Sequence, residues 1–351
     1  MPSVKIALDA VGGDAGLSAT IEGAIAAANA FGVEVLLVGP RAAVRSELSA
    51  RGIAETDSRF SIEDASEAVG MDEDAASACR AKPRSSIMLA AQACAQGRTS
   101  AFVSAGNSAA TRTAALWHLK RIPGVLRPAI AVPIPTPRGV CILLDAEANM
   151  DCKPWHLVQF AMMGSLFCRL AYGVASPKVG LLSSGEEEGS GNDLAKQAFS
   201  LLKNAEVNFS GCVEGRDVPM GKVDVVVCDG FVGNVIVKSI EGTASAMMSQ
   251  LKGELRASWR YRLPALALRG PLSRLNRKMS YDEYGGAPLL GIDGTVIVAH
   301  GCANARAITN AIGAAVVTAR ACLPKGLREV VTRAAQATAS THPVELKEDP
   351  V

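Results

Sequence analysis

The stretch Val223–Gly242, VDVVVCDGFVGNVIVKSIEG, decides the fold, because it joins a buried strand, a glycine-rich turn and the start of a helix. Within it, Val225–Cys228 is a continuous apolar, mostly β-branched run, which is typical of a parallel strand covered on both faces. Four small or polar residues then turn the chain: Asp229, Gly230, Gly233 and Asn234. Free backbone N–H groups at such a corner suit a phosphate or an oxyanion, although an ordinary tight turn explains the same residues.

The same succession of strand, polar corner and helix recurs along the whole chain. We expect strands at 4–8, 33–38, 60–65, 99–103, 130–132, 140–144 and 178–182, and helices at 18–30, 41–51, 85–96 and 193–203. Residues 292–299 predict a hairpin with Asp293-Gly294 as its turn. Because parallel strands need crossover connections, the alternation predicts an α/β fold, layered α/β/α, with a mostly parallel sheet.

Length and composition bound the architecture. With 351 residues and 49% hydrophobic content, we expect one α/β catalytic unit over residues 1–335, as a single domain or two lobes. Residues 252–280 are predicted to form a helical protrusion from it, and residues 336–351 a polar tail. A net charge of +2 is too small to indicate a nucleic-acid partner. The sequence shows no signal-peptide pattern and no run of eighteen apolar residues, so we expect a cytoplasmic protein.

Cofactor and metal motifs are missing from the sequence. It contains neither G-x-G-x-x-G nor G-x-x-x-x-G-K-[ST], so a dinucleotide or P-loop nucleotide site is not supported. The nine cysteines are scattered without a C-x-x-C pair, which favours reduced core thiols over disulfides or zinc ligands. No serine lies in a G-x-S-x-G elbow, and we expect Cys152 to pack in the core. We therefore expect no cofactor, no metal and no covalent intermediate.

Two further corners follow predicted strands and carry candidate site residues. After 99–103 come Ser104, Gly106 and Asn107, which could bind an anion, although Asn107 could equally cap the following helix. After 140–144, a loop containing Asp151 and Lys153 suggests a phosphate site. A carboxylate pair that merely caps the helix beginning at Pro154 is nearly as good an explanation of this loop.

Other polar residues add weaker candidates. Arg80 and Lys82 lie in a polar passage between two predicted elements, where they could hold a dianion. Glu186 and Asn192 belong to the loop after 178–182, whose acids could bind a metal, but hydrogen-bonding roles fit better. His300 follows a predicted strand beside a glycine, where it could act chemically or could serve as a hydrogen-bonded structural residue.

A basic, amphipathic segment runs from Lys252 to Lys278. Prolines and glycine divide it into short helical pieces, which indicates a protrusion from the α/β body. Basic heads and apolar stems suit an anionic bilayer or an acidic protein partner, whereas a dimer-forming arm is the simpler alternative. The candidate contact residues are Trp259, Leu263, Leu266 and Leu268.

Several segments together resemble the bacterial phosphate acyltransferases, from Val4 to about Arg333. They are ALDAVGGD, VSAGNSAA, RPAIAVPIPT, DCKP with QFAMMG, GLLSSGEEEGSGN, FSGCVEGRDV, VDVVVCDGFVGN, EYGGAPLLG and VIVAHG. The resemblance implies transfer of a long-chain acyl group from acyl-acyl-carrier protein to inorganic phosphate, for phosphatidic acid synthesis. It also implies a fold like that of isocitrate and isopropylmalate dehydrogenases, a homodimer, peripheral contact with the inner face of the membrane, and cooperation with a membrane glycerol-phosphate acyltransferase.

The chain departs from the family pattern at Ala15, Ala109, Glu147 and Ser190, where the family usually has histidine, glycine, glycine and lysine. Eight positions that match are carried over: Asn107, Asp151, Lys153, Glu186, Asn192, Asp229, Asn234 and His300. We expect direct attack of phosphate on the thioester. In this hypothesis Lys153, with Arg80 or Lys82, holds the dianion, Asn107 and Asn234 stabilise the oxyanion, and Asp151 or His300 orients the phosphate.

Three alternatives remain open at this point. A phosphate transacylase that uses short acyl-coenzyme A shares the reaction type but not the acyl carrier. A dehydrogenase shares the implied fold but needs clustered aspartates and a dinucleotide loop. A membrane-docking adaptor without catalysis would keep the fold and the arm alone.

Overall fold

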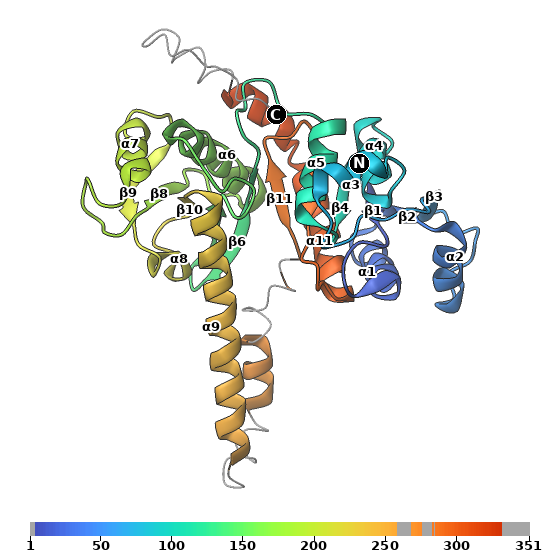
Figure 1. Ribbon diagram of the computed structural model, residues 1–351. Coiled ribbons are helices and arrows are strands. Elements are labelled where there is room, and N and C mark those ends of the chain that lie inside the picture. The colour runs from blue at the N-terminus through green and yellow to red at the C-terminus, as the bar shows by residue number, and fades with distance from the viewer. Residues whose placement is uncertain (1–3, 258–267, 276–282, 284, 332–351) are drawn as a thin grey trace.

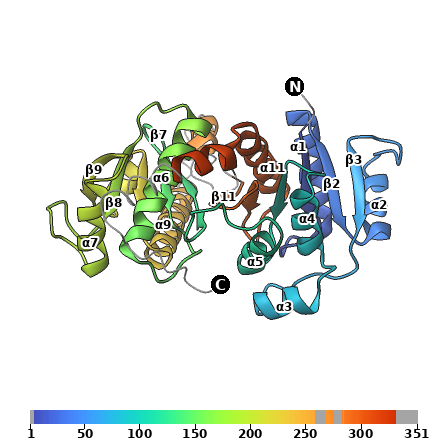
Figure 2. The same cartoon turned by 90° about the horizontal axis from the view of Figure 1, so that it is seen from above.

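The computed structural model describes residues 4–257, 268–275, 283 and 285–331, which form two lobes side by side (Figures 1 and 2). The first lobe is built on a sheet of seven strands, which are, in spatial order, β3 (Phe60–Asp64), β2 (Glu34–Gly39), β1 (Lys5–Asp9), β4 (Ala101–Ser104), β12 (Val296–Val298), β11 (Ala287–Leu290) and β5 (Ala129–Ile130). The second is built on a sheet of five strands: β6 (Val132–Thr136), β7 (Gly139–Leu144), β10 (Val225–Val227), β8 (Lys178–Leu182) and β9 (Asn208–Val213).

Most neighbouring strands are parallel, as the alternating sequence predicts. The exceptions are β11, which runs antiparallel to both of its neighbours, and the edge strand β6. The carboxyl ends of β1, β4 and β12 therefore share one edge of the first sheet. Those of β7, β10 and β8 share one edge of the second sheet. The polar corners of each lobe are gathered at these edges.

Helices cover both faces of each sheet. In the first lobe, α1 (Gly16–Phe31), α2 (Arg41–Ala50) and α11 (Ala305–Arg320) pack on one face, and α3 (Ala75–Ala81), α4 (Ser86–Ala95) and α5 (Ser108–His118) on the other. In the second lobe, α6 (Pro154–Tyr172) and α7 (Asp193–Leu202) cover one face, and α8 (Asp217–Met220) and the start of α9 (Gly230–Ala257) the other. The α/β/α layering predicted from the sequence is confirmed.

The lobes are connected by more than one crossing of the chain. Residues 305–320 return to the first lobe, but Leu323, Leu327 and Val331 then pack into the core of the second. Within the described residues, no single helix has the length and apolar character to cross a bilayer. The bent pair Ala305–Arg320 and Leu323–Val331, with 52° between its parts, meets that test by length and composition alone.

Two sequence expectations about strands need correction. The single strand expected at 130–132 is two strands in different sheets, since β5 ends at Ile130 and β6 begins at Val132. Pro133 and Pro135 lack N–H groups and therefore favour an edge position, which β6 occupies. The hairpin near the end is present, but its first strand is Ala287–Leu290, so Asp293-Gly294 belongs to a longer loop.

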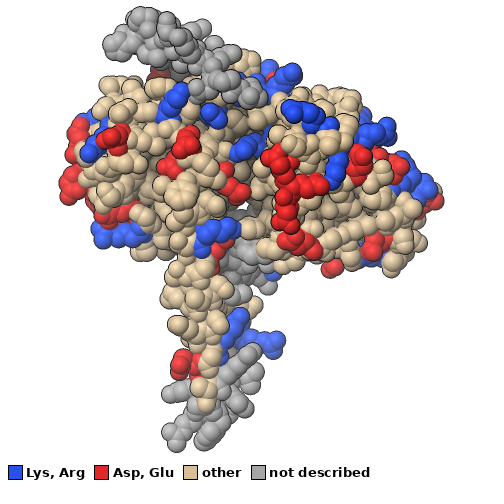
Figure 3. Space-filling view, viewed as in Figure 1, with Lys and Arg blue, Asp and Glu red and all other residues tan. Residues whose placement is uncertain are grey.

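Helix α9 extends from the second lobe as a long projection (Figure 1). Its 28 residues correspond to about 42 Å at 1.5 Å per residue. On the face seen in Figure 3 the projecting part of this helix shows few charged side chains, and Met247 is 64% exposed. A second helical piece, residues 268–275, lies beside it. Most of this projection lies upstream of 252, and residues 258–267 and 276–280 of the protrusion predicted at 252–280 lie outside the described residues.

Candidate functional site between the lobes

The corners of the first sheet close tightly on one another. The Asp14 N–H donates to the Gly301 carbonyl at 2.7 Å, which ties the corner after β1 to that after β12. A Cβ on Gly13, whose φ is +91°, would lie 2.8 Å from the Gly301 oxygen. A Cβ on Gly12 would lie 2.8 Å from the Gly106 nitrogen. Glycine here permits backbone contact, which leaves little space for a ligand.

Asp9 holds this closed corner from beneath. It is 2% exposed, and burial raises the pKa of its carboxyl. Ser104 Oγ donates to Asp9 Oδ2 at 2.7 Å and accepts from the Gly106 N–H at 3.0 Å. Ser104 and Gly106 therefore have internal hydrogen-bonding and packing roles at the end of β4.

The corners of the second sheet are organised by a second buried aspartate, Asp145, directly after β7. Its carboxylate accepts from the backbone N–H groups of Ile130 at 2.9 Å and Asn149 at 2.6 Å. It also accepts from the Asn149 side-chain amide at 2.9 Å. Because Ile130 belongs to the first sheet, this carboxylate joins the two lobes. Burial raises the pKa of Asp145 to about 6.

Two glycines of the organising stretch close the back of this second corner. The Gly230 N–H donates to the Asn149 carbonyl at 2.7 Å, and the Glu147 N–H donates to the Gly230 carbonyl at 3.0 Å. A Cβ on Gly233 would lie only 1.9 Å from the Asp145 carbonyl oxygen. The start of α9 is thereby pressed against the loop 145–149, so Gly230 and Gly233 shape the wall of the site.

A pocket of about 370 Å³ opens between the lobes in front of this loop. Its wall comes from α5, from the end of the connection to β5 and from the loop after β7: Ser108, Ala109, Arg112, Arg127, Ile130, Glu147, Ala148, Asn149, Met150 and Asp151. The Arg112 guanidinium donates to the Ala148 carbonyl, and Ser108 Oγ donates to Glu147 Oε1 at 3.2 Å. Figure 3 shows the surface hollowed between the lobes, with charged side chains bordering the hollow.

The sequence predicts one mostly parallel sheet, whereas the structure has two, so the polar corners do not all lie at the edge of a single sheet. The corners belong to two sheets, because the chain leaves the first after β5 and returns to it only at β11. What converges is the α5 corner of one lobe and the β7 and β10 corners of the other. Residues from both lobes nevertheless line one shared pocket.

Asp151 and Lys153 lie at and beside this pocket. Asp151 lines it and is exposed. Lys153 precedes α6, where its N–H donates to His156 Nδ1 at 3.1 Å and its ammonium lies 5.5 Å from the centre of the Trp155 ring. Between them, Cys152 is half-buried against the core, as expected. Burial, followed by the charges of Asp145 and Asp229, raises the pKa of this thiol to about 12. A thiol so strongly protonated is a poor nucleophile.

Three predicted residues of the first lobe have structural partners of their own. Asn107 caps α5 through a hydrogen bond from the Ala110 N–H at 3.0 Å, and its amide donates to the Met71 carbonyl at 3.0 Å. Lys82 pairs with Glu73 at 2.7 Å. The Arg80 guanidinium lies 5.9 Å from the centre of the Trp117 ring. None of these three residues lines the pocket.

The remaining candidates of the organising stretch lie at the root of α9. Asp229 accepts from the Val232 N–H at 2.9 Å and so caps the helix, while Asn234 is half-buried in its first turns. One turn further, the Lys238 ammonium contacts His300 Nε2. This contact joins the root of α9 to the corner after β12.

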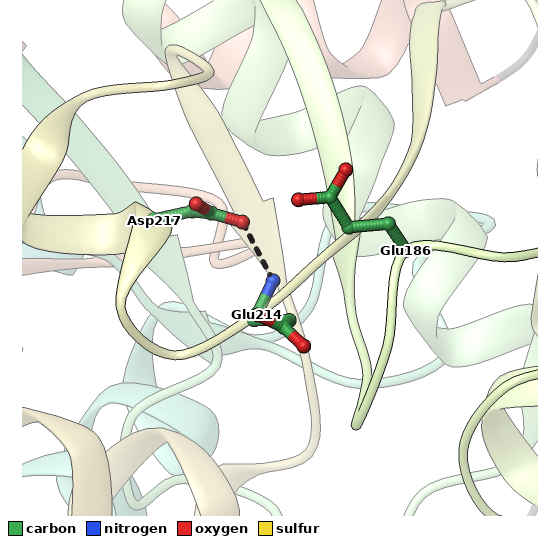
Figure 4. Close-up of side chains that lie close together, drawn as sticks. All are labelled: Glu186, Glu214 and Asp217. Atoms are coloured by element: carbon green, nitrogen blue, oxygen red, sulfur yellow. Dashed lines mark hydrogen bonds between the residues drawn. The ribbon is translucent and has the colours of Figure 1, made fainter.

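Glu186 and Asn192 lie in the loop after β8 and do not line the pocket. Asn192 caps α7 by accepting from the Ala195 N–H at 2.9 Å. Figure 4 shows Glu186 close to Glu214 and Asp217, with one carboxylate oxygen from each within 4.8 Å of the others. Lys222 Nζ lies 2.6 Å from Glu186 Oε1, and the positive charge of this ammonium offsets part of the negative charge of the three carboxylates. Hydrogen-bonding and ion-pair roles thus describe both residues.

Of the four candidate contact residues of the arm, only Leu268 lies within the described residues. Trp259, Leu263 and Leu266 lie outside the described residues. Leu268 is 49% exposed in the helical piece 268–275.

Four residues that organise the two corners or line the pocket were not predicted from the sequence. They are Asp9, Arg112, Arg127 and Asp145. Two signals were available: each aspartate directly ends or follows a buried strand, and Arg112 lies one helical turn after Ser108. Arg127 had no local signal, because it reaches the pocket from a connection that is distant in sequence.

The two mixed, mostly parallel sheets with helices on both faces define an α/β fold of the isocitrate dehydrogenase-like kind. A phosphotransacetylase structure from Streptococcus pyogenes is similar with a TM-score of 0.60 and 16% identity, covering 91% of this chain and 94% of that one. The structure of 4-hydroxythreonine-4-phosphate dehydrogenase from Klebsiella pneumoniae has a TM-score of 0.55 and 15% identity, covering 90% and 98%. At this identity the likeness concerns the fold alone.

Closer relatives give the family. A model described as "Fatty acid synthesis protein" matches residues 4–324. Phosphate acyltransferase of Elusimicrobium minutum is 47% identical over 309 residues, covering 88% of this chain and 90% of that protein. Phosphate acyltransferase of Endomicrobium trichonymphae is 46% identical over 333 residues, covering 93% and 98%. The chain belongs to the phosphate acyltransferase family of fatty acid and phospholipid synthesis.

Proposed function

We propose that the protein transfers a long-chain fatty acyl group from acyl-acyl-carrier protein to inorganic phosphate, and that the inter-lobe pocket binds the phosphate. The observation that carries the site is that Arg112 and Arg127, both half-buried, line one pocket of about 370 Å³. Arginine suits phosphate recognition because its planar guanidinium donates two parallel hydrogen bonds. Family membership supports the reaction.

The reaction needs positioning more than acid catalysis. A phosphate oxygen attacks the thioester carbonyl, the new C–O bond forms, and collapse of the tetrahedral oxyanion breaks the C–S bond. A thiol with an ordinary pKa of about 8.5 leaves readily as thiolate and takes its proton from solvent. Arg112 and Arg127 hold the phosphate, while Asp151 and Lys153 at the rim orient it and the incoming acyl carrier.

The remaining predicted residues support this site from behind. Asn107 holds the α5 corner in place through its two hydrogen-bonded ends. Asp229, Asn234 and His300 lie around the root of α9, where Asp229 caps the helix and the Asn234 amide stabilises the oxyanion. Direct attack without an acyl-enzyme agrees with the raised pKa of Cys152.

The decisive assay supplies long-chain acyl-acyl-carrier protein and phosphate, and measures acyl phosphate. We expect product with the carrier-protein donor, and a much slower reaction with short acyl-coenzyme A. Equal or faster turnover of acyl-coenzyme A would favour the transacylase alternative. Absence of acyl phosphate with either donor would leave a non-catalytic adaptor.

Lys153→Ala tests whether the Lys153 ammonium helps to hold the phosphate in the pocket. If Lys153 helps to hold the dianion, its removal raises the KM for phosphate and leaves the KM for the acyl donor nearly unchanged. An unchanged phosphate saturation curve would remove Lys153 from the phosphate site.

We propose further that the arm docks the enzyme on an anionic membrane surface, where its product meets a membrane glycerol-phosphate acyltransferase. Met247, Leu251 and Leu268 are exposed apolar residues on the projecting helices, and such faces bind the headgroup boundary of bilayers. Liposome sedimentation with wild type and Leu268→Glu tests this, with neutral liposomes as the control. Undiminished binding of Leu268→Glu to anionic liposomes would place the contact elsewhere.

The same arm also offers a surface for a homodimer. Sedimentation equilibrium of wild type and Met247→Glu distinguishes the two uses of the arm. A monomeric Met247→Glu protein that still binds liposomes would assign Met247 to the dimer contact.

A further inference from the structure

Glu147 is an unusual residue in the wall of the pocket. Its backbone has φ +84°, a left-handed conformation that glycine adopts without strain and glutamate does not. The hydrogen bond from its N–H to the Gly230 carbonyl, at 3.0 Å, holds the backbone in this position. The side chain is thereby directed across the pocket, where its Oε1 accepts from Ser108 Oγ of the opposite lobe at 3.2 Å.

The charges in the pocket are balanced by this carboxylate. Arg112 and Arg127 contribute two positive charges to the wall, and Glu147 and Asp151 contribute two negative charges. The Arg112 guanidinium contacts the carbonyl of Ala148, the residue next to Glu147. A phosphate dianion that enters this pocket therefore meets a carboxylate already hydrogen-bonded to the Ser108 hydroxyl.

We propose that Glu147 sets how tightly the pocket binds inorganic phosphate, because its negative charge, held in the pocket by the hydrogen bond from Ser108, opposes the phosphate dianion. The inference rests on the proposed function for the identity of the anion. Phosphate binds only when the Glu147 side chain turns out of the pocket, which its exposed position allows. Glu147 thus lowers the affinity of the pocket for phosphate. It takes no part in the bond-making step.

Glu147→Gln tests the proposal, because it keeps the size and the hydrogen-bond acceptor but removes the charge. We expect the KM for phosphate to fall by about fivefold, as for loss of one nearby like charge in a partly solvated site, with kcat changed less than about twofold. Glu22→Gln on α1, also an exposed glutamate, is the matched control and should leave the KM unchanged.

A second readout needs no turnover. The rise in Tm on adding inorganic phosphate, compared with chloride at equal ionic strength, should be larger for Glu147→Gln than for wild type. If the glutamine variant folds poorly, Glu147→Gly serves in its place, because the left-handed backbone suits glycine.

Two results would overturn the proposal. One is an unchanged phosphate KM and an unchanged phosphate-induced Tm shift in both variants. The other is a fall in kcat at constant KM, which would place Glu147 in the transition state. Loss of acyl phosphate formation by the wild type itself would instead contradict the proposed function, while the Tm measurement would still report on Glu147.

Discussion

The two lobes use similar corner sequences for opposite purposes. In the first lobe, the corners after β1, β4 and β12 close on one another, so that a Cβ on Gly12 or Gly13 would clash with neighbouring backbone. In the second, the loop after β7 is pressed against the root of α9 on one side and leaves a pocket on the other. A glycine-rich corner therefore indicates close backbone approach, and only its neighbours decide whether a ligand has room.

Each corner also rests on one buried aspartate, and the two differ in what they hold. Asp9 serves only its own lobe, through Ser104. Asp145 accepts hydrogen bonds from both lobes and so fixes the width of the pocket. Perturbing the second corner should consequently have larger effects than perturbing the first.

The largest effect is expected for Gly233→Ala in the second corner. Its Cβ would lie 1.9 Å from the Asp145 carbonyl oxygen, so the helix or the loop must move. We expect a loss of about 3 kcal/mol in the free energy of unfolding, measured by urea denaturation, because backbone cannot yield as a side chain can. Gly253→Ala in the same helix meets nothing within 4 Å and should be neutral or stabilising. Equal behaviour of the two variants would contradict this close packing.

Asp145→Asn should have the next largest effect, and one that depends on pH. The Asp145 carboxylate accepts hydrogen bonds from Ile130 and Asn149, and an asparagine amide cannot accept all of them. We therefore expect a loss of about 2 kcal/mol in the free energy of unfolding at pH 7. Burial raises the pKa of Asp145 to about 6 in the folded protein, above its ordinary value of 3.8. The folded state thus binds this proton more tightly, and the stabilisation is lost as pH rises through about 6.

As the pH falls from 7 to 4.5, the free energy of unfolding of the wild type should accordingly increase relative to that of Asp145→Asn. Urea denaturation of both proteins at several pH values measures the difference. A constant difference across this range would show that Asp145 does not titrate there.

In the first corner, Ser104→Ala should lower the free energy of unfolding by less than Asp145→Asn does. The substitution leaves the Gly106 N–H and one oxygen of Asp9 without their partner, for which we expect a loss of about 1 to 2 kcal/mol. Ser46→Ala on the exposed side of α2 is the control and should change stability by less than about 0.5 kcal/mol. A larger loss for Ser104→Ala than for Asp145→Asn would reverse the comparison between the corners.

The smallest expected effect concerns the left-handed positions of the two corners. Gly13 has φ +91° and Glu147 has φ +84°, so the second corner places a side chain where the first has none. Glu147→Gly should be more stable than Glu147→Ala by about 0.5 to 1 kcal/mol, since only glycine relieves the backbone. Thermal denaturation of the two variants provides the measurement. Equal Tm values would mean that this backbone relaxes without glycine.

Much of the fold was predictable from local sequence. The apolar run Val225–Cys228, the turn at Asp229 and the alternation of such units indicated α/β layering, because period and turn chemistry are local properties. The resemblance motifs indicated the family, which the relatives confirm. The sequence did not reveal that residues 130 and 132 belong to different sheets, because a strand's partner depends on distant chain.

The sequence by itself therefore determined the layers, the positions of the polar corners and the family, all of which follow from residue type and spacing. The tertiary structure decided which corners meet. It brought Arg127 and the loop after β7 to the start of α5, and it placed Lys82 and Glu186 with other partners. A pocket is a relation between backbones that are far apart in sequence, and no local pattern records the distance between them.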